Sequence, residues 1–158
     1  LHVDNYQWLK NIYESLNNGI LLVIDYSLEG KRFYSSSKID GNIVSYNNQK
    51  LNNNILKDSG NCDLTTHICS EILINDAELV GFRFEGLVKQ GEALLTLGLA
   101  EMIYELQIKY KDDLSQALIK REALLRLVDP ICLGDFKWFI FQKTKSKDIK
   151  FRTKILID

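Results

Sequence analysis

The sequence predicts an α/β domain, and three observations carry this prediction. Residues 19–26 begin with a glycine, continue as five aliphatic residues and end in an acid and a tyrosine, which is typical of a strand buried on both faces of a parallel sheet. Residues 4–16 repeat apolar side chains at spacings of three and four, as an amphipathic helix does. Residues 82–88 alternate and residues 136–141 are aromatic, and both patterns predict strands.

The first helix and the first strand belong together. Asp4 is the predicted N-cap of the helix, and Gly19 is the predicted signal that ends it. A helix followed by a buried strand is one arm of a βαβ unit, so we expect a further strand upstream of this sequence. Because open α/β sheets bind ligands at the carboxyl ends of their strands, Asp25 and Tyr26 are candidate functional residues. The alternative is that Asp25 caps the next turn and Tyr26 only packs.

The segment 27–61 is rich in Ser, Asn, Lys and Gly and lacks a strong apolar period. We interpret it as a functional lid or binding loop, and a disordered surface segment is the alternative. Downstream, Asp63 or Thr65 is the predicted cap of a helix that runs to about Leu79 and ends at Gly81.

The start of this predicted helix offers a second group of candidates. If the helix begins beside strand 19–26, then Asp63, Thr65 and His67 bring a carboxylate, a hydroxyl and an imidazole to the cleft next to Asp25. Capping alone explains Asp63 without any chemistry, and it is the commoner use of such a residue. Both interpretations stay open on the sequence.

The second half of the chain predicts helices at 91–110 and 114–127, whose wide apolar stripes we assign to the core. Pro130 ends the second helix, because proline disfavours helical geometry in the residue before it. The segment 151–157 predicts a last strand at the edge of the sheet. No linker or repeat divides the chain, so we expect a single domain over residues 1–158.

Composition argues against several function classes. The 158 residues carry 20 Lys and Arg against 21 Asp and Glu, so no net field favours a nucleic acid or an anionic membrane as partner. No apolar run approaches the roughly 20 residues of a membrane span, so we expect no membrane insertion. Three cysteines without a signal-peptide pattern argue against a disulfide framework. Cys62, His67 and Cys69 match no usual zinc spacing, so we predict no metal site.

Common catalytic and phosphate-binding motifs are absent. The sequence contains no Gly-x-Gly-x-x-Gly, no phosphate loop, no Gly-x-Ser-x-Gly elbow and no His-Glu-x-x-His. Spacing alone therefore leads no further than an α/β domain with an unidentified cleft.

Four segments occur in order along the chain: Ile24-Asp25-Tyr26-Ser27, Asp63-Leu64-Thr65-Thr66-His67-Ile68, Lys89 through Leu99, and Asp129-Pro130 through Gly134 to Lys137. Together they resemble the MidA-like family of S-adenosylmethionine-dependent methyltransferases, which includes the mitochondrial protein arginine methyltransferase needed for assembly of respiratory complex I. Ser27 stands where that family has a glycine.

The resemblance implies a fold and a missing part. It identifies the chain as the C-terminal part of a Rossmann-like class I methyltransferase fold, with strands 19–26, 82–88 and 136–142 as the fifth, sixth and seventh. A helical insertion separates the last two, and the seventh strand is expected antiparallel between the fifth and the sixth. The family's glycine-rich cofactor loop lies upstream and is absent from this chain. The outer edge of strand 19–26 is therefore expected to be unpaired and open to self-association.

The resemblance also implies a function, which is methyl transfer from S-adenosylmethionine to an arginine of a partner protein, such as a subunit of respiratory complex I or an NDH-type complex. The guanidinium of arginine stays protonated, so carboxylates must orient it and a further group must accept its proton. The candidate catalytic residues are Asp25, Asp63 and His67, and the candidate substrate-binding residues are Tyr26, Thr65 and Gln90.

The alternative function is a non-catalytic protein-interaction module, because the chain lacks the family's main cofactor loop. Low proline content and many Asn and Lys residues suggest an AT-rich genome. We therefore expect the bacterial cytoplasm rather than the mitochondrial matrix.

Overall fold

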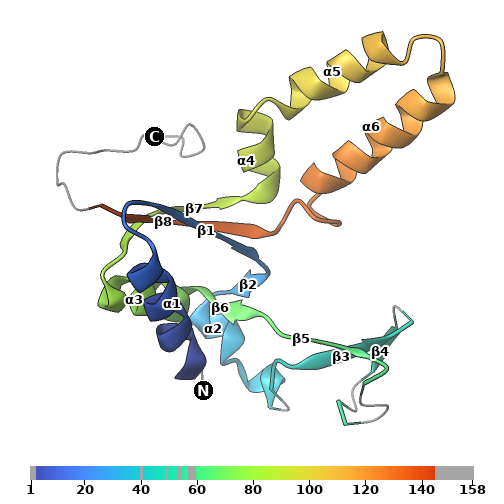
Figure 1. The fold of residues 1–158 in the computed structure, drawn as a ribbon. Helices are drawn as coiled ribbons and strands as arrows, with labels where there is room; N and C mark the ends of the chain where they lie inside the picture. Colours follow the sequence, from blue (N-terminus) through green and yellow to red (C-terminus); the bar gives the residue numbers. More distant parts are fainter. Residues whose placement is uncertain (1–2, 40, 49, 53–54, 57–59, 145–158) are drawn as a thin grey trace.

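The main sheet is built around its last strand, β8 (Lys137–Lys143), which lies between β1 (Gly19–Asp25) and β7 (Arg83–Lys89). β8 runs antiparallel to both neighbours, in the order and direction that the sequence predicts. The structure is a computed structural model and describes residues 3–39, 41–48, 50–52, 55–56 and 60–144 (Figure 1).

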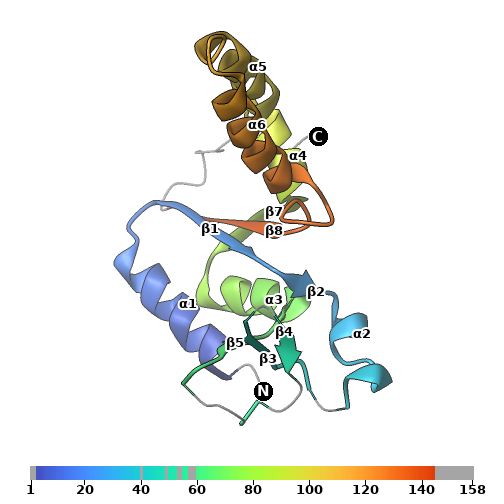
Figure 2. The same cartoon turned by 90° about the vertical axis from the view of Figure 1, so that its right-hand side faces the viewer.

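The remaining elements are short strands and helices on both sides of this sheet. In chain order they are α1 (Val3–Ser15), β2 (Ser27–Leu28), α2 (Gly30–Phe33), the 3-10 helix η1 (Ser36–Lys38), β3 (Val44–Asn47), β4 (Lys50–Asn52), β5 (Asp63–Thr65), β6 (Ile68–Cys69), α3 (Ser70–Val80), α4 (Gln90–Thr96), α5 (Leu99–Lys109) and α6 (Leu114–Val128). α1 and α3 lie on one side of the sheet, and α4 to α6 project from the other (Figures 1 and 2).

The core lies between the sheet and the pair α1 and α3. Phe139 and Phe141 of β8 are fully buried and pack with Leu9 of α1 and with Leu73 and Ala77 of α3. The two phenylalanines stack in parallel with ring centroids 6.5 Å apart. Because fully burying one such side chain contributes on the order of 2 kcal/mol, this cluster holds β8 and the two helices together.

The ends of the first helix differ from the prediction. α1 begins at Val3, so Asp4 lies in its first turn, where an acid favours the positive end of the helix dipole, and does not act as the N-cap. The helix ends at Ser15 and Gly19 starts β1. Two asparagines precede Gly19, and asparagine favours such a turn.

β1 is buried on one face only, which corrects the prediction that both faces are buried. Its residues alternate between partly buried and exposed positions, and Ile20, Leu22 and Ile24 are 38 to 43% exposed. α4 to α6 project away from the sheet and leave these side chains uncovered by the described residues (Figure 1). Among the described residues, the outer edge of β1 pairs with no other strand.

The segment 27–61 is not the long loop that its composition predicts. It contains five short elements, and β3 pairs with both β4 and β5 in a small antiparallel sheet. Ser45 of β3 is fully buried and donates its hydroxyl hydrogen to the carbonyl of Asn52. Strands are usually recognised in a sequence by alternating apolar residues. In β3 a polar side chain bonds the neighbouring strand instead, so this signal is weak.

The predicted capping roles of Asp63 and Thr65 are wrong. Both residues lie in β5, and the following helix, α3, begins only at Ser70. Pairing of β5 with β3 fixes the extended backbone there, so tertiary contacts override the local capping signal. The prediction that the helix ends at Gly81 is confirmed, because Gly81 adopts a left-handed φ of 114°.

The long helical stretch 91–110 is two helices, α4 and α5. Gly98, with a φ of 100°, separates them. α6 ends at Val128, before Pro130, as predicted. The assignment of the apolar stripes to the core is wrong for most of their residues, because only Ala93, Leu99 and Ala117 of these helices are buried apolar residues in the described chain.

Two further findings complete the comparison with the sequence. The predicted edge strand 151–157 lies outside the described residues. Among those that are described, no helix has both the length and the apolar character needed to cross a membrane.

Gly134 gives a direct test of how the chain returns from α6 to β8. A Cβ atom at this position would lie 2.2 Å from the carbonyl oxygen of Val128, so Gly134→Ala must displace backbone. We expect the free energy of unfolding to fall by about 3 kcal/mol in urea titrations, as overpacking typically does. Gly30→Ala is the matched control, because its nearest contact is 3.5 Å from the Glu71 side chain. Equal stability of the two variants would contradict this close approach.

Candidate functional site

A row of charged residues crosses the sheet at the carboxyl end of β1. Asp25, the last residue of β1, lies opposite Lys137 of β8, which in turn lies opposite Lys89 of β7. Directly opposed residues of neighbouring strands have Cβ atoms about 5 Å apart, so the Cβ atom of Lys137 lies close to those of both Asp25 and Lys89. The row places one carboxylate beside two ammonium groups where the sheet ends.

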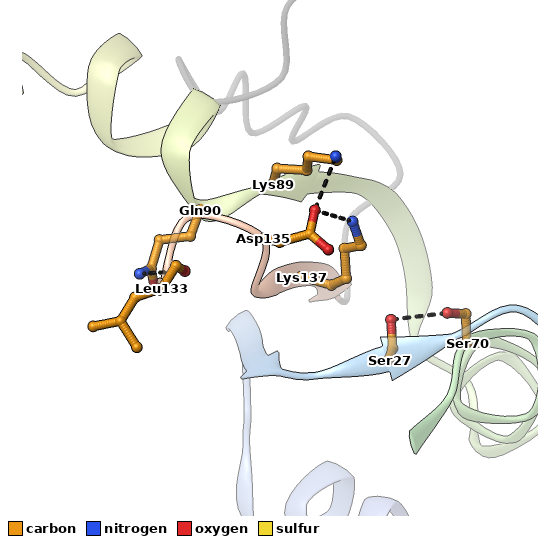
Figure 3. Close-up of polar contacts among 7 residues, drawn as sticks. All are labelled: Ser27, Ser70, Lys89, Gln90, Leu133, Asp135 and Lys137. Carbon is orange, nitrogen blue, oxygen red and sulfur yellow. Dashed lines mark hydrogen bonds and ion pairs between the residues drawn. The ribbon is translucent and has the colours of Figure 1, made fainter. Parts of the chain in front are cut away.

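Asp135 connects the two lysines of this row (Figure 3). Its Oδ1 accepts hydrogen bonds from Lys89 Nζ at 2.9 Å and from Lys137 Nζ at 3.3 Å. The bond from Lys89 is the main cause that lowers the pKa of Asp135, and the same bond raises the pKa of Lys89. The side chains of Lys89 and Asp135 are each 50% exposed, so the bridge orients side chains more than it stabilises the fold.

Tyr26 forms an aromatic contact at the same end of the sheet. Its backbone N–H donates to Asp25 Oδ1 at 2.7 Å, and its ring packs against Phe136 with centroids 3.8 Å apart and planes tilted by 31°. Its carbonyl accepts a hydrogen bond from Ile68 N, so β6 is held beside the strand end. Tyr26 is still 41% exposed as a residue, so part of it is available to a ligand.

His67 approaches Tyr26 from the segment before β6. The two ring centroids are 6.3 Å apart in an edge-on arrangement. Burial is the main cause that lowers the pKa of His67 below 6.5, and the Lys38 ammonium lowers the pKa further. The Asp25 carboxylate acts in the opposite direction and raises the pKa of His67. The imidazole is therefore neutral at neutral pH.

Ser27 and Ser70 join the strand end to α3. The Ser70 hydroxyl donates to the Ser27 hydroxyl oxygen at 3.0 Å (Figure 3). A glycine at position 27 has no side chain with which to form this bond. The substitution seen against the family pattern thus adds a contact between β2 and α3.

Gln90, a predicted substrate-binding residue, lies where β7 meets α4. Its Nε2 donates to the carbonyl oxygen of Leu133 at 3.0 Å (Figure 3). The same Nε2 donates to the carbonyl oxygen of Leu127 at 3.1 Å, and Oε1 of Gln90 accepts from Trp138 Nε1 at 3.3 Å. In the structure its amide ties α6 and the start of β8 to α4. Its predicted contact with substrate stays a prediction.

The structure brings together only part of the predicted site. Asp25, Tyr26 and His67 form one group, whereas Asp63 and Thr65 are exposed on β5, where they pair with β3. Among the described residues, no hydrogen bond, ion pair or ring contact joins Asp63 or Thr65 to that group. The roles predicted for these two residues stay predictions.

Comparison with known proteins shows which family this chain belongs to. The sequence pattern of the family described as "Putative S-adenosyl-L-methionine-dependent methyltransferase" matches residues 1–88, more than half of the chain. The chain belongs to this family. The matched part runs from α1 into β7 and includes Asp25, Tyr26 and His67. No match was found among curated proteins.

Solved structures support the same fold. The chain is similar to a COG1565 superfamily member from Burkholderia thailandensis with S-adenosyl-homocysteine bound, with a TM-score of 0.77 and 18% identity over 90% of this chain and 36% of that chain. A second crystal structure of a COG1565 superfamily protein from the same organism gives a TM-score of 0.74 and 18% identity over 87% of this chain and 36% of that one. The family member described here thus spans about a third of the length of these relatives.

The residues present do not include a recognisable cofactor loop or metal site. The sequence holds no Gly-x-Gly segment, so it does not fit the glycine-rich loop expected to bind the cofactor. In the described part of the chain, no three His, Cys, Asp or Glu side chains form a group that could hold a metal ion. What the site does offer is a carboxylate, a neutral imidazole and an exposed aromatic ring.

The sequence did not select five residues of this site as candidates. Phe136 packs against Tyr26, Asp135 bridges Lys89 and Lys137, and Lys38 lowers the pKa of His67. Phe136 and Lys137 belong to one of the segments that carry the family resemblance, but their placement beside Asp25 requires the register of β1 against β8. No sequence pattern marks Lys38.

The pKa of His67 tests the geometry around Asp25. We expect an NMR titration to give a pKa below 6.5, with Lys38→Met raising it and Asp25→Asn lowering it further. The folded state favours the neutral imidazole, so this contribution to stability is present above about pH 6.5 and is lost as pH falls through the folded-state pKa. A pKa that rises or stays constant in Asp25→Asn would contradict the proximity of the two groups.

Proposed function

We propose that this chain forms the acceptor side of a Rossmann-like class I methyltransferase that methylates an arginine side chain of a partner protein. The observation that carries the proposal is the grouping of Asp25, Tyr26 and His67 at the carboxyl end of β1. Family membership supports S-adenosylmethionine as the methyl donor. A strand end is also where open α/β sheets usually hold their substrates.

Each of the three side chains has a different role toward the substrate guanidinium: orientation, stacking or proton acceptance. The Asp25 carboxylate, which receives one hydrogen bond from the Tyr26 amide, retains acceptor capacity to orient the N–H groups of the substrate. The exposed ring of Tyr26 offers a flat surface on which a guanidinium can stack. Neutral His67 accepts the proton that the arginine nitrogen loses on methylation.

The solved relatives are longer than this chain, which covers 36% of each of them. We propose that strands continuing the sheet past β1 hold the cofactor, because the outer edge of β1 is unpaired among the described residues. The helices between β7 and β8 then correspond to an insertion between the last two strands of the methyltransferase fold.

The expected partner is a subunit of respiratory complex I or an NDH-type complex, as the family resemblance implies. The proposed compartment is the bacterial cytoplasm. The two solved relatives come from Burkholderia thailandensis, a bacterium, which supports this choice over the mitochondrial matrix.

A second candidate function is a non-catalytic protein-interaction module. The observation that favours it is the exposure of large apolar side chains on α5 and α6, of which Tyr104 is 65% and Leu114 70% exposed. The two functions differ in what Asp25 does, because a docking module has no need of an oriented carboxylate at the strand end.

Substitution of the two candidate carboxylates separates these functions. In the intact protein that carries this chain, we expect Asp25→Asn to lower methyl transfer to protein arginine by about 100-fold, since it removes an orienting charge. The readout is methylarginine in the partner protein by mass spectrometry. Asp63→Asn tests the predicted role of the second candidate in the same assay. Glu78→Gln is the control, because Glu78 is exposed on α3 and belongs to no candidate site, and we expect less than about a threefold change. Full activity of Asp25→Asn would contradict the proposal.

A further inference from the structure

α5 and α6 form a helical hairpin, which we call the arm, that projects away from the sheet (Figures 1 and 2). Its helices have 11 and 15 residues and pack on each other. Their outer surfaces are not covered by the described residues. Six large apolar side chains of the arm are more than half exposed, namely Met102, Tyr104, Ile108, Leu114, Leu118 and Ile119.

The exposed residues of α6 form a stripe. Leu114, Leu118 and Leu125 follow each other at spacings of four and seven, so they lie on one face of the helix. Arg121 falls on the same face, between Leu118 and Leu125. The stripe therefore presents an apolar surface with one guanidinium in its middle.

The outer side of α5 carries a complementary groove. Tyr104 and Ile108, 65 and 60% exposed, line a shallow groove of about 520 Å³ together with Ala100, Glu101 and Glu105. The groove is apolar along its length and bears two carboxylates. The guanidinium of Arg121 in the α6 stripe is opposite in charge to the two carboxylates of this groove.

The charged groups on these two surfaces lack partners within the described chain. No ion pair or hydrogen bond of the described residues involves the side chains of Glu101, Glu105 or Arg121. By contrast, Arg126 of α6 pairs with Glu122 at 2.7 Å. Glu101, Glu105 and Arg121 thus border exposed apolar residues and have no ion-pair partner among the described residues.

We propose that the arm docks onto the arm of a second copy of this chain. The α6 stripe of each copy lies in the α5 groove of the other, with Arg121 beside Glu101 and Glu105 across the interface. Two hairpins packed in this way form a four-helix bundle, and the reciprocal contact closes with twofold symmetry. Docking buries the apolar side chains and leaves the strand end at Asp25 outside the interface, because the arm projects from the sheet (Figure 1).

Analytical ultracentrifugation of the chain over a broad range of concentrations tests the proposal. We expect a reversible dimer that Leu118→Glu abolishes, because a carboxylate is costly to bury among apolar groups. Leu118 is 52% exposed, so the substitution leaves the fold intact, which circular dichroism checks. Leu79→Glu is the matched control, because Leu79 is 74% exposed on α3, away from the arm, and should leave the dimer unchanged.

A mixing experiment distinguishes arm-to-arm docking from other contacts. Arg121→Glu and Glu105→Arg should each raise the dimer Kd at least about tenfold, since each places like charges across the interface. An equal mixture of the two variants restores both opposite-charge contacts and should form a heterodimer of near wild-type affinity. A monomer at submillimolar concentration, a dimer that survives Leu118→Glu through the edge of β1, or a mixture that stays monomeric would each overturn the proposal.

Discussion

The position of β8 between β1 and β7 is the constraint on which the rest of the structure depends. β8 is antiparallel to both neighbours and joins segments from the start and the middle of the chain into one sheet. Its Phe139 and Phe141 fill the core against α1 and α3. Its register also sets Lys137 opposite Asp25, and the preceding Phe136 packs against Tyr26. One strand thus supplies both the core and one wall of the candidate site.

The same sheet explains why the molecule combines an ordered strand end with uncovered apolar surface. At the carboxyl end of β1, hydrogen bonds and ring contacts order Asp25, Tyr26 and His67. At its outer edge and on one of its faces, β1 has no neighbour in the described chain. The chain spans about a third of its solved relatives, and the acceptor-side role proposed here accounts for both the ordered end and the open edge.

Local patterns were sufficient to predict α1, β1, β7 and β8, because each has a strong apolar period or an aromatic run. The short strands of segment 27–61 could not be predicted, because polar side chains bond neighbouring strands there and the sequence shows no apolar alternation. An apolar helix stripe looks the same whether it faces a core or a free surface, which is why α5 and α6 were misassigned. Asp25, Tyr26 and His67 could be selected as candidates, but their contacts with Phe136 and Lys137 follow only from strand register.

Amide hydrogen exchange of the dilute chain tests the central claim, that β8 is the enclosed strand and β1 the open edge of the sheet. Amides of β8 bond on both sides and should exchange slowest of all. In β1, every second amide bonds to β8 and should be protected, whereas the intervening amides point to the free edge and should exchange much faster. Uniform protection along β1 at low concentration, or faster exchange in β8 than in β7, would contradict the account.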